Sequence, residues 1–304
     1  MNDHTNGKNG HANGHLVLED RQGMTFSVNR EVFVSPTVFE DENRAIFDKC
    51  WIYVGHASEV KNPGDFRTRH VAGRPVIFCR DRKGEVRALF NVCRHRGALV
   101  CREREGNTRQ FQCIYHGWTY NTDGSIKGIP GDDAYPPGYD KQGKGLTPVA
   151  RLEHYKDFYF ANLDADAVDL HTYLAGAKDY IDLVVDQSPS GRMGIISGVQ
   201  EYDIKANWKL LVENTIDFYH TVPLHKTYFR FLEKSGSDIS GGVAGNGYDL
   251  GCGHAVVAFS AGWGRPVARW QPSWGESERK RIAEVRTDFD ARFGAEHARM
   301  VCEV

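Results

Sequence analysis

The sequence predicts an α+β fold, in which an all-β domain precedes a domain that mixes helices with strands. Three observations support this class. Short runs of β-branched and aromatic residues, separated by Gly and Pro, fill residues 50–163. Apolar residues then recur at helical spacing over 171–185, and again over 207–214. Between these two helices, residues 193–206 are expected to form a strand.

The first 16 residues are rich in Asn, Gly and His and carry too little apolar surface to fold, so we expect a disordered tail. Residues 35–50 predict a short helix that Ser35 caps and Pro36 begins. The apolar residues of this helix are expected to face inward; they are Phe39, Ala45, Ile46 and Phe47.

The all-β domain is expected to contain strands at 51–54, 65–71, 76–79, 86–92, 110–112 and 158–163. A long loop rich in Gly, Pro and Asp occupies 128–145, and an Asp-rich joint at 164–169 leads into the second domain. Towards the end of the chain, the alternating Arg and Glu residues of 274–299 predict an exposed amphipathic helix.

The composition excludes several classes of protein. A formal net charge of −2 gives no basic surface for nucleic acid, and no apolar run reaches the roughly 20 residues that span a bilayer. The amino terminus lacks the pattern of a signal peptide. We therefore expect a cytoplasmic protein with neither nucleic acid nor membrane as a partner, whose cysteines outside the metal motif described next are reduced thiols.

Two pairs of potential metal ligands occur in the all-β domain, Cys93-x-His95 and Cys113-x2-His116. Two thiolates and two imidazoles suit either a structural zinc or a Rieske [2Fe–2S] cluster, in which two His replace two Cys on one iron. Zinc ribbons usually repeat Cys-x2-Cys, whereas each arm here carries one Cys and one His. The mixed spacing favours the Rieske cluster, with zinc as the alternative.

With their flanking residues, Cys93-Arg94-His95-Arg96-Gly97 and Cys113-Ile114-Tyr115-His116-Gly117-Trp118 resemble the Rieske motif of aromatic ring-hydroxylating dioxygenases, large (α) subunit. By that resemblance the Trp118 indole is expected to lie next to the cluster as a hydrogen-bond donor. The strand runs and the joint at 164–169 place the limits of the Rieske domain at 50 and 163. The resemblance then implies that 17–49 is an N-terminal segment of the catalytic domain and that 164–304 is a helix-grip catalytic domain.

A second motif lies about a hundred residues further on, where His220 and His225 flank Pro223. Two His and one carboxylate form the facial triad of non-heme Fe(II) oxygenases, although a His pair alone is a weak signal. The segment resembles the mononuclear-iron motif of the same family, which implies that His220 and His225 bind Fe(II). Asp217 lies three residues before His220 and could orient its ring; the family assigns the matching Asp a role in catalytic electron transfer between subunits.

The resemblance implies an oxygenase in which the cluster supplies electrons to Fe(II) for the O₂-dependent dihydroxylation of an aromatic ring. It further implies NAD(P)H as the electron source through a reductase, often with a ferredoxin, a small β subunit, and a trimer of α subunits. The family's third iron ligand is an Asp near the carboxyl end, which has no match before Val304. We therefore expect a truncated large subunit with an incomplete catalytic domain.

Two alternatives remain open from the sequence. A related Rieske monooxygenase or demethylase would use the same two iron centres. An electron-transfer Rieske protein without oxygenase activity would use only the cluster, and the missing carboxylate ligand favours this hypothesis.

Overall fold

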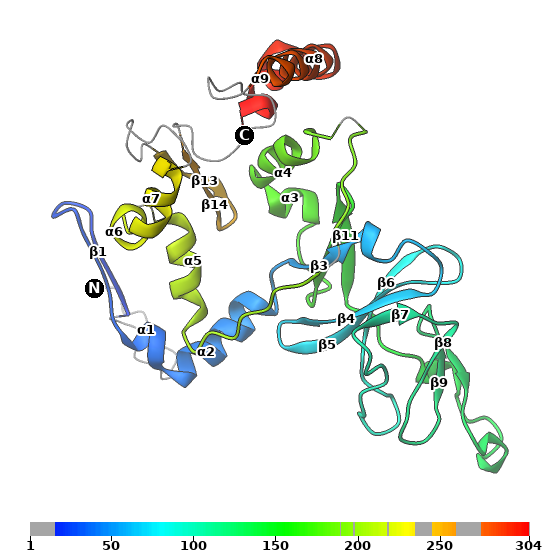
Figure 1. Cartoon of the computed structure of the whole chain (residues 1–304). Coiled ribbons are helices and arrows are strands. Elements are labelled where there is room, and N and C mark those ends of the chain that lie inside the picture. The colour runs from blue at the N-terminus through cyan, green and yellow to red at the C-terminus, as the bar shows by residue number, and fades with distance from the viewer. Residues whose placement is uncertain are drawn as a thin grey trace, which may run out of the picture.

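The computed structural model of the chain describes residues 16–188, 190–196, 198–217, 219–234, 245–259 and 275–303. The predicted disordered tail lies outside the described residues, apart from Leu16. Figure 1 shows a domain of strands beside a group of helices, with the N-terminal segment running from the far side of the helices to the strands. The predicted α+β class, with the all-β domain preceding the mixed one, is confirmed.

The all-β domain contains three antiparallel sheets. The largest has the strand order β6-β5-β4-β7, and its strands are β4 (Asp65–Val71), β5 (Arg74–Arg80), β6 (Val86–Phe90) and β7 (Glu105–Asn107). The second has the order β11-β12-β3, with β3 (Ile52–His56), β11 (Arg151–Tyr155) and β12 (Phe158–Asn162). The third has the order β10-β9-β8, with β8 (Gln110–Gln112), β9 (Thr119–Asn121) and β10 (Ile126–Gly128).

Two apolar cores hold these sheets together. The residues of β5 alternate between them, because successive side chains of a strand point to opposite faces. Val76 and Phe78 belong to one core, which includes Val54 and Val71, whereas Ile77 belongs to the other. This other core also contains the predicted cluster ligands Cys93 and Cys113 together with Trp118 and Tyr120. The two cysteines of the metal motif are thus built into the core of the domain.

The N-terminal segment forms the hairpin β1 (Val17–Asp20) and β2 (Thr25–Val28), then α1 (Glu31–Val34), α2 (Pro36–Glu42) and a π-helical turn, η1 (Asn43–Phe47). The Ser35 hydroxyl caps α2 as predicted, accepting from the Val38 N–H. The expectation that the apolar residues face inward is wrong for three of them. Phe39, Ala45 and Ile46 are exposed, because this segment contacts the rest of the chain along a narrow stripe around Glu42 and Phe47.

The mixed domain contains the helices α3 (Leu170–Leu174), α4 (Ala177–Val185), α5 (Trp208–Ile216), α6 (Thr221–Leu224), α7 (Lys226–Lys234), α8 (Glu276–Phe293) and α9 (Ala295–Glu303). Its hairpin joins β13 (Gly245–Gly251) to β14 (His254–Phe259). The helix predicted over 171–185 is interrupted at Ala175, whose φ is +45°, and the one predicted over 274–299 is interrupted at Gly294. Among the described residues, no helix has the length and apolar character needed to cross a bilayer.

The strand expected at 193–206 is wrong: the described residues of this segment form no strand. A strand requires a neighbour to satisfy its backbone groups, and this segment instead lies against the all-β domain as an extended connector. The Ile195 N–H donates to the Ser58 hydroxyl at 2.8 Å, and Arg104 pairs with Glu201 at 3.0 Å.

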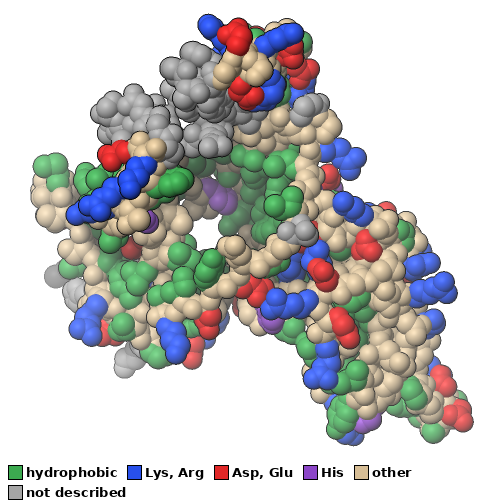
Figure 2. Space-filling model, in the orientation of Figure 1, with side chains coloured by type: hydrophobic (Ala, Val, Ile, Leu, Met, Phe, Trp, Pro, Cys, Tyr) green, Lys and Arg blue, Asp and Glu red, His purple; other side chains and the backbone are tan. Residues whose placement is uncertain are grey.

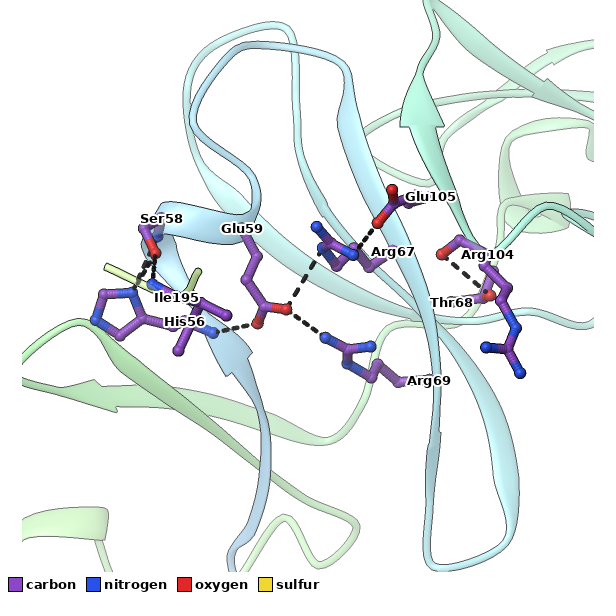
Figure 3. A network of polar contacts seen from close by, with 9 residues as sticks. All are labelled: His56, Ser58, Glu59, Arg67, Thr68, Arg69, Arg104, Glu105 and Ile195. Carbon is purple, nitrogen blue, oxygen red and sulfur yellow. Dashed lines mark hydrogen bonds and ion pairs between the residues drawn. The ribbon is translucent and has the colours of Figure 1, made fainter. Parts of the chain in front are cut away.

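A polar network lies between the connector and β4 (Figure 3). The buried Glu59 carboxylate accepts from the His56 N–H at 2.9 Å and pairs with Arg67 and Arg69, and Arg67 also pairs with Glu105. These side chains line a cavity of about 550 Å³. The charged groups of this network pair with one another. We therefore interpret it as attaching the connector to the all-β domain, and not as a site for a charged ligand.

Candidate metal centres

Two loops of the same backbone geometry carry the first set of predicted ligands. One follows β6 and contains Cys93 and His95; the other joins β8 to β9 and contains Cys113 and His116. In the first loop the Gly97 N–H donates to the Cys93 carbonyl, and in the second the Gly117 N–H donates to the Cys113 carbonyl, both at 2.9 Å. The two glycines have φ of +74° and +72°, a conformation that residues with a Cβ rarely adopt.

The structure brings the four predicted ligands together. Cys93 and Cys113 are buried, at 3% and 2% exposed, and the rings of His95 and His116 lie 4.7 Å apart towards the loop tips. The buried Nδ1 of His95 has no hydrogen-bond partner, as expected of an atom that binds a metal. Two inner thiols and two outer imidazoles fit the ligand set of a Rieske [2Fe–2S] cluster.

Two aromatic residues adjoin these ligands. The Tyr120 hydroxyl lies 3.2 Å from the Cys93 sulfur and accepts from the Arg94 N–H at 3.2 Å. Burial and the contact with Cys93 raise the pKa of Tyr120, so the phenol stays protonated and can donate to a thiolate. Trp118, which was expected next to the cluster as a hydrogen-bond donor, lies with its ring parallel to that of His95, with centroids 5.0 Å apart. The donor role of its indole stays a prediction.

Asn91 closes the base of the first loop. Its buried side chain accepts from the N–H groups of Val100 and Cys101 and donates to the Cys101 carbonyl, over 2.7–3.1 Å. Sequence reasoning missed both Asn91 and Tyr120. A polar residue at the end of the apolar run 86–92 was the available signal for Asn91. No signal pointed to Tyr120, because its partner lies on the other loop.

The second pair of predicted ligands flanks α6. His220 precedes this helix and His225 follows it, and their ring centroids are 5.5 Å apart. The Asp217 carboxylate accepts from Nδ1 of His220 at 3.0 Å, which leaves Nε2 of that ring available to a metal. The Tyr219 N–H and His220 together lower the pKa of Asp217, so the carboxylate is charged at neutral pH.

The third ligand of a facial triad does not join this pair among the described residues. No group of three or more His, Cys, Asp or Glu side chains among all the described residues lies close enough to hold one ion. The cluster motif does not need such a group, because a Rieske cluster takes two Cys on one iron and two His on the other. The acidic residues of α8 instead face solvent or pair with basic neighbours, as Glu278 does with Arg281. The two imidazoles therefore fit a mononuclear iron site in part.

Comparison with known proteins finds family models that match the two regions in which the motifs lie. Residues 50–150 match the model of the Rieske [2Fe-2S] domain, and residues 196–293 match the model of the ring hydroxylating alpha subunit (catalytic domain). The anthranilate 1,2-dioxygenase large subunit of Acinetobacter baylyi is 40% identical over 204 residues, which are 67% of this chain and 43% of the relative. The biphenyl 2,3-dioxygenase subunit alpha of Rhodococcus jostii is 38% identical over 205 residues, or 67% and 44%.

Among solved structures, naphthalene 1,2-dioxygenase from Rhodococcus sp. bound to indole is similar with a TM-score of 0.73 and 32% identity, over 91% of this chain and 61% of the other. The chain thus spans a little under half the length of these two curated relatives. Since its first domain matches the Rieske model and its second matches the catalytic model, the chain belongs to the family of Rieske ring-hydroxylating oxygenase alpha subunits.

Proposed function

We propose that the chain is the oxygenase component of an aromatic ring-hydroxylating dioxygenase, with Cys93, His95, Cys113 and His116 holding the [2Fe–2S] cluster and His220 and His225 holding Fe(II). When bound, the two centres supply the electrons and the O₂ chemistry for dihydroxylation of an aromatic ring. The proposal is carried by one observation: the chain combines a buried thiol pair beside two imidazoles with a second imidazole pair that a carboxylate orients.

The residues of this chain have distinct tasks in the proposal. The loops of Cys93 and Cys113 hold the thiolates inside the core and leave the imidazoles near the surface, where electrons can enter and leave. Asp217 fixes the ring of His220 and, being charged, can hold the proton of Nδ1. We assign Asp217 to the route by which electrons reach Fe(II).

Figure 1 shows β8 and β9, which flank the loop of Cys113, at one end of the molecule, and α6, which His220 and His225 flank, among the helices at the other end. This arrangement bears on how the subunits assemble. Electron transfer slows steeply with distance, so the separation of the two sites within one chain favours a neighbouring α chain as the source of electrons for each iron. We propose a trimer of α subunits with a β subunit, located in the cytoplasm. Electrons would come from NAD(P)H through a reductase, with or without a ferredoxin. We also assign residues 17–49 to the catalytic domain.

Iron counting tests the proposal. We expect three irons and two labile sulfides per chain after reconstitution under anaerobic conditions, and two irons in His220→Ala, with the cluster absorption unchanged. His70→Ala, which removes an exposed imidazole from β4, is the matched control and should retain three. Two irons in the unmodified chain would instead favour an electron-transfer protein, and a colourless protein with one zinc would exclude both.

A monooxygenase or demethylase would give the same iron count, so product analysis is needed as well. With a reductase and an aromatic substrate such as benzoate, ¹⁸O₂ should place two labelled oxygens in each product molecule. Incorporation of a single labelled oxygen would favour the monooxygenase.

A further inference from the structure

The beginning of α5 is tied to the N-terminal segment of the chain. Asn207 caps the helix by accepting from the Lys209 N–H at 3.1 Å, and its amide nitrogen donates to the Phe33 carbonyl at 3.1 Å. The ammonium group of Lys209 lies over the Phe33 ring, 5.7 Å from its centroid. Residues about 170 positions apart in the sequence thus share one contact region.

Glu42, at the end of α2, is the centre of this region. Its Oε2 accepts from the Trp208 indole N–H at 2.8 Å, and its Oε1 pairs with the Lys209 ammonium group. The side chains of Glu42 and Lys209 are 11% and 16% exposed, so the ion pair is largely shielded from water. The edge of the Trp208 ring packs against Phe47, with centroids 5.0 Å apart.

Beyond its first turn, α5 runs beside β14 and exposes apolar side chains. Leu210, Leu211 and Val212 are 47%, 56% and 48% exposed, and Figure 2 shows apolar side chains gathered over the helical part of the molecule. No residue of α5 is buried. The side-chain hydrogen bonds and the ion pair that tie α5 to the N-terminal segment thus come from its first turn.

The far end of α5 leads directly into the second metal site. The helix ends at Ile216, Asp217 follows at once, and His220 comes three residues later. Because an α-helix is a stiff rod, rotation or translation of its first turn moves its last turn by a similar amount. Metal sites require their ligands to be held within about 0.5 Å of the productive geometry.

We infer that Glu42 is a positioning residue for the mononuclear iron, acting through Trp208, Lys209 and α5 on Asp217 and His220. The inference rests on the proposed function and deepens it. Glu42 lies outside both regions that match family models, so neither match assigns it a role. Through Glu42, the N-terminal segment would support the iron site, although it supplies none of the predicted ligands.

The test compares Glu42→Ala, Glu42→Gln and Glu40→Gln in the full chain. Glu42→Ala removes both acceptors, whereas Glu42→Gln keeps an oxygen for the indole but loses the ion pair. Glu40→Gln makes the same charge change on an exposed residue of the same helix. Equilibrium dialysis against graded Fe(II) gives the dissociation constant of the mononuclear site, and visible absorption gives the cluster content of the same samples.

Loss of a group that hydrogen-bonds a metal ligand typically weakens metal binding by about 10–100-fold. Because Glu42 acts through α5 and not on a ligand itself, we expect a smaller loss for Glu42→Ala, up to about tenfold. Glu42→Gln should lie between this variant and the unmodified chain, and Glu40→Gln should bind Fe(II) as the unmodified chain does. Cluster content should be equal in all of them. Unchanged Fe(II) binding in Glu42→Ala would overturn the inference, as would parallel loss of cluster and iron, which indicates general unfolding. If the unmodified chain binds no third iron, the proposed function fails instead.

Discussion

Replacing Tyr120 by Phe should lower the reduction potential of the cluster. The change deletes a hydroxyl 3.2 Å from the Cys93 sulfur and leaves the buried ring in place. Reduction adds negative charge to the cluster, so a hydrogen bond to sulfur stabilises the reduced state more than the oxidised one. If the two states differ by about 1 kcal/mol in this bond, the midpoint potential falls by about 40 mV for one electron.

Redox titration with dithionite, followed by the electron paramagnetic resonance signal of the reduced cluster, measures this shift. Tyr53→Phe on β3 is the control, because it removes a half-exposed hydroxyl that belongs to another sheet of the domain. Its potential should match that of the unmodified chain. A shift of less than about 10 mV in Tyr120→Phe, with the cluster fully assembled, would refute the reasoning that Tyr120 donates to Cys93.

Three further predictions concern stability. Asn91→Ala removes three buried hydrogen bonds and should lower the free energy of unfolding by about 2–4 kcal/mol, measured by urea denaturation. The yield of cluster should fall as well. An unchanged midpoint of urea denaturation would contradict the role given to Asn91. Gly97→Ala should lower the free energy of unfolding by about 1 kcal/mol, because the residue has a left-handed φ. Gly117→Ala should lower it further, because the new Cβ would also lie 3.1 Å from the Pro130 side chain. Equal losses in urea denaturation would argue against this contact. Burial raises the pKa of Cys79 to about 12, so the folded thiol stays neutral where an unfolded one ionises. The contribution of Cys79 to stability should be constant below about pH 9 and should be lost as the pH rises towards 12; Cys79→Ala should therefore reduce the alkaline fall in stability, measured by urea titrations at graded pH.

The sequence predicted six of the ten strands of the all-β domain, because their signal is local, and it missed β7, β9, β10 and β11. The predicted limits of 65–71 and 110–112 coincide with β4 and β8, where alternation of apolar and polar residues is clear. The strand expected at 193–206 failed for a non-local reason. Its alternating residues fit a strand, but strand formation depends on a neighbour, and the described residues supply none.

The same distinction explains which site residues could be predicted. Cys93, His95, Cys113 and His116 have a spacing that chemistry alone constrains, and the structure places them together. The partners of these residues depend on which loops meet. Tyr120 reaches Cys93 from β9, and Glu42 reaches Trp208 across 166 positions, so neither contact has a pattern in the sequence.

The two metal centres differ in how the chain supports them, and this difference predicts how they assemble. The ligands of the cluster come from hairpin loops whose bases are buried in one core, and glycine turns fix both loops. The ligands of the mononuclear iron follow a helix without a buried residue, which is held at its first turn by a distant segment. The cluster should therefore form in chains whose iron site is distorted, whereas iron binding should respond to changes far from His220. Cluster content and mononuclear iron are then separate measures of two parts of the fold.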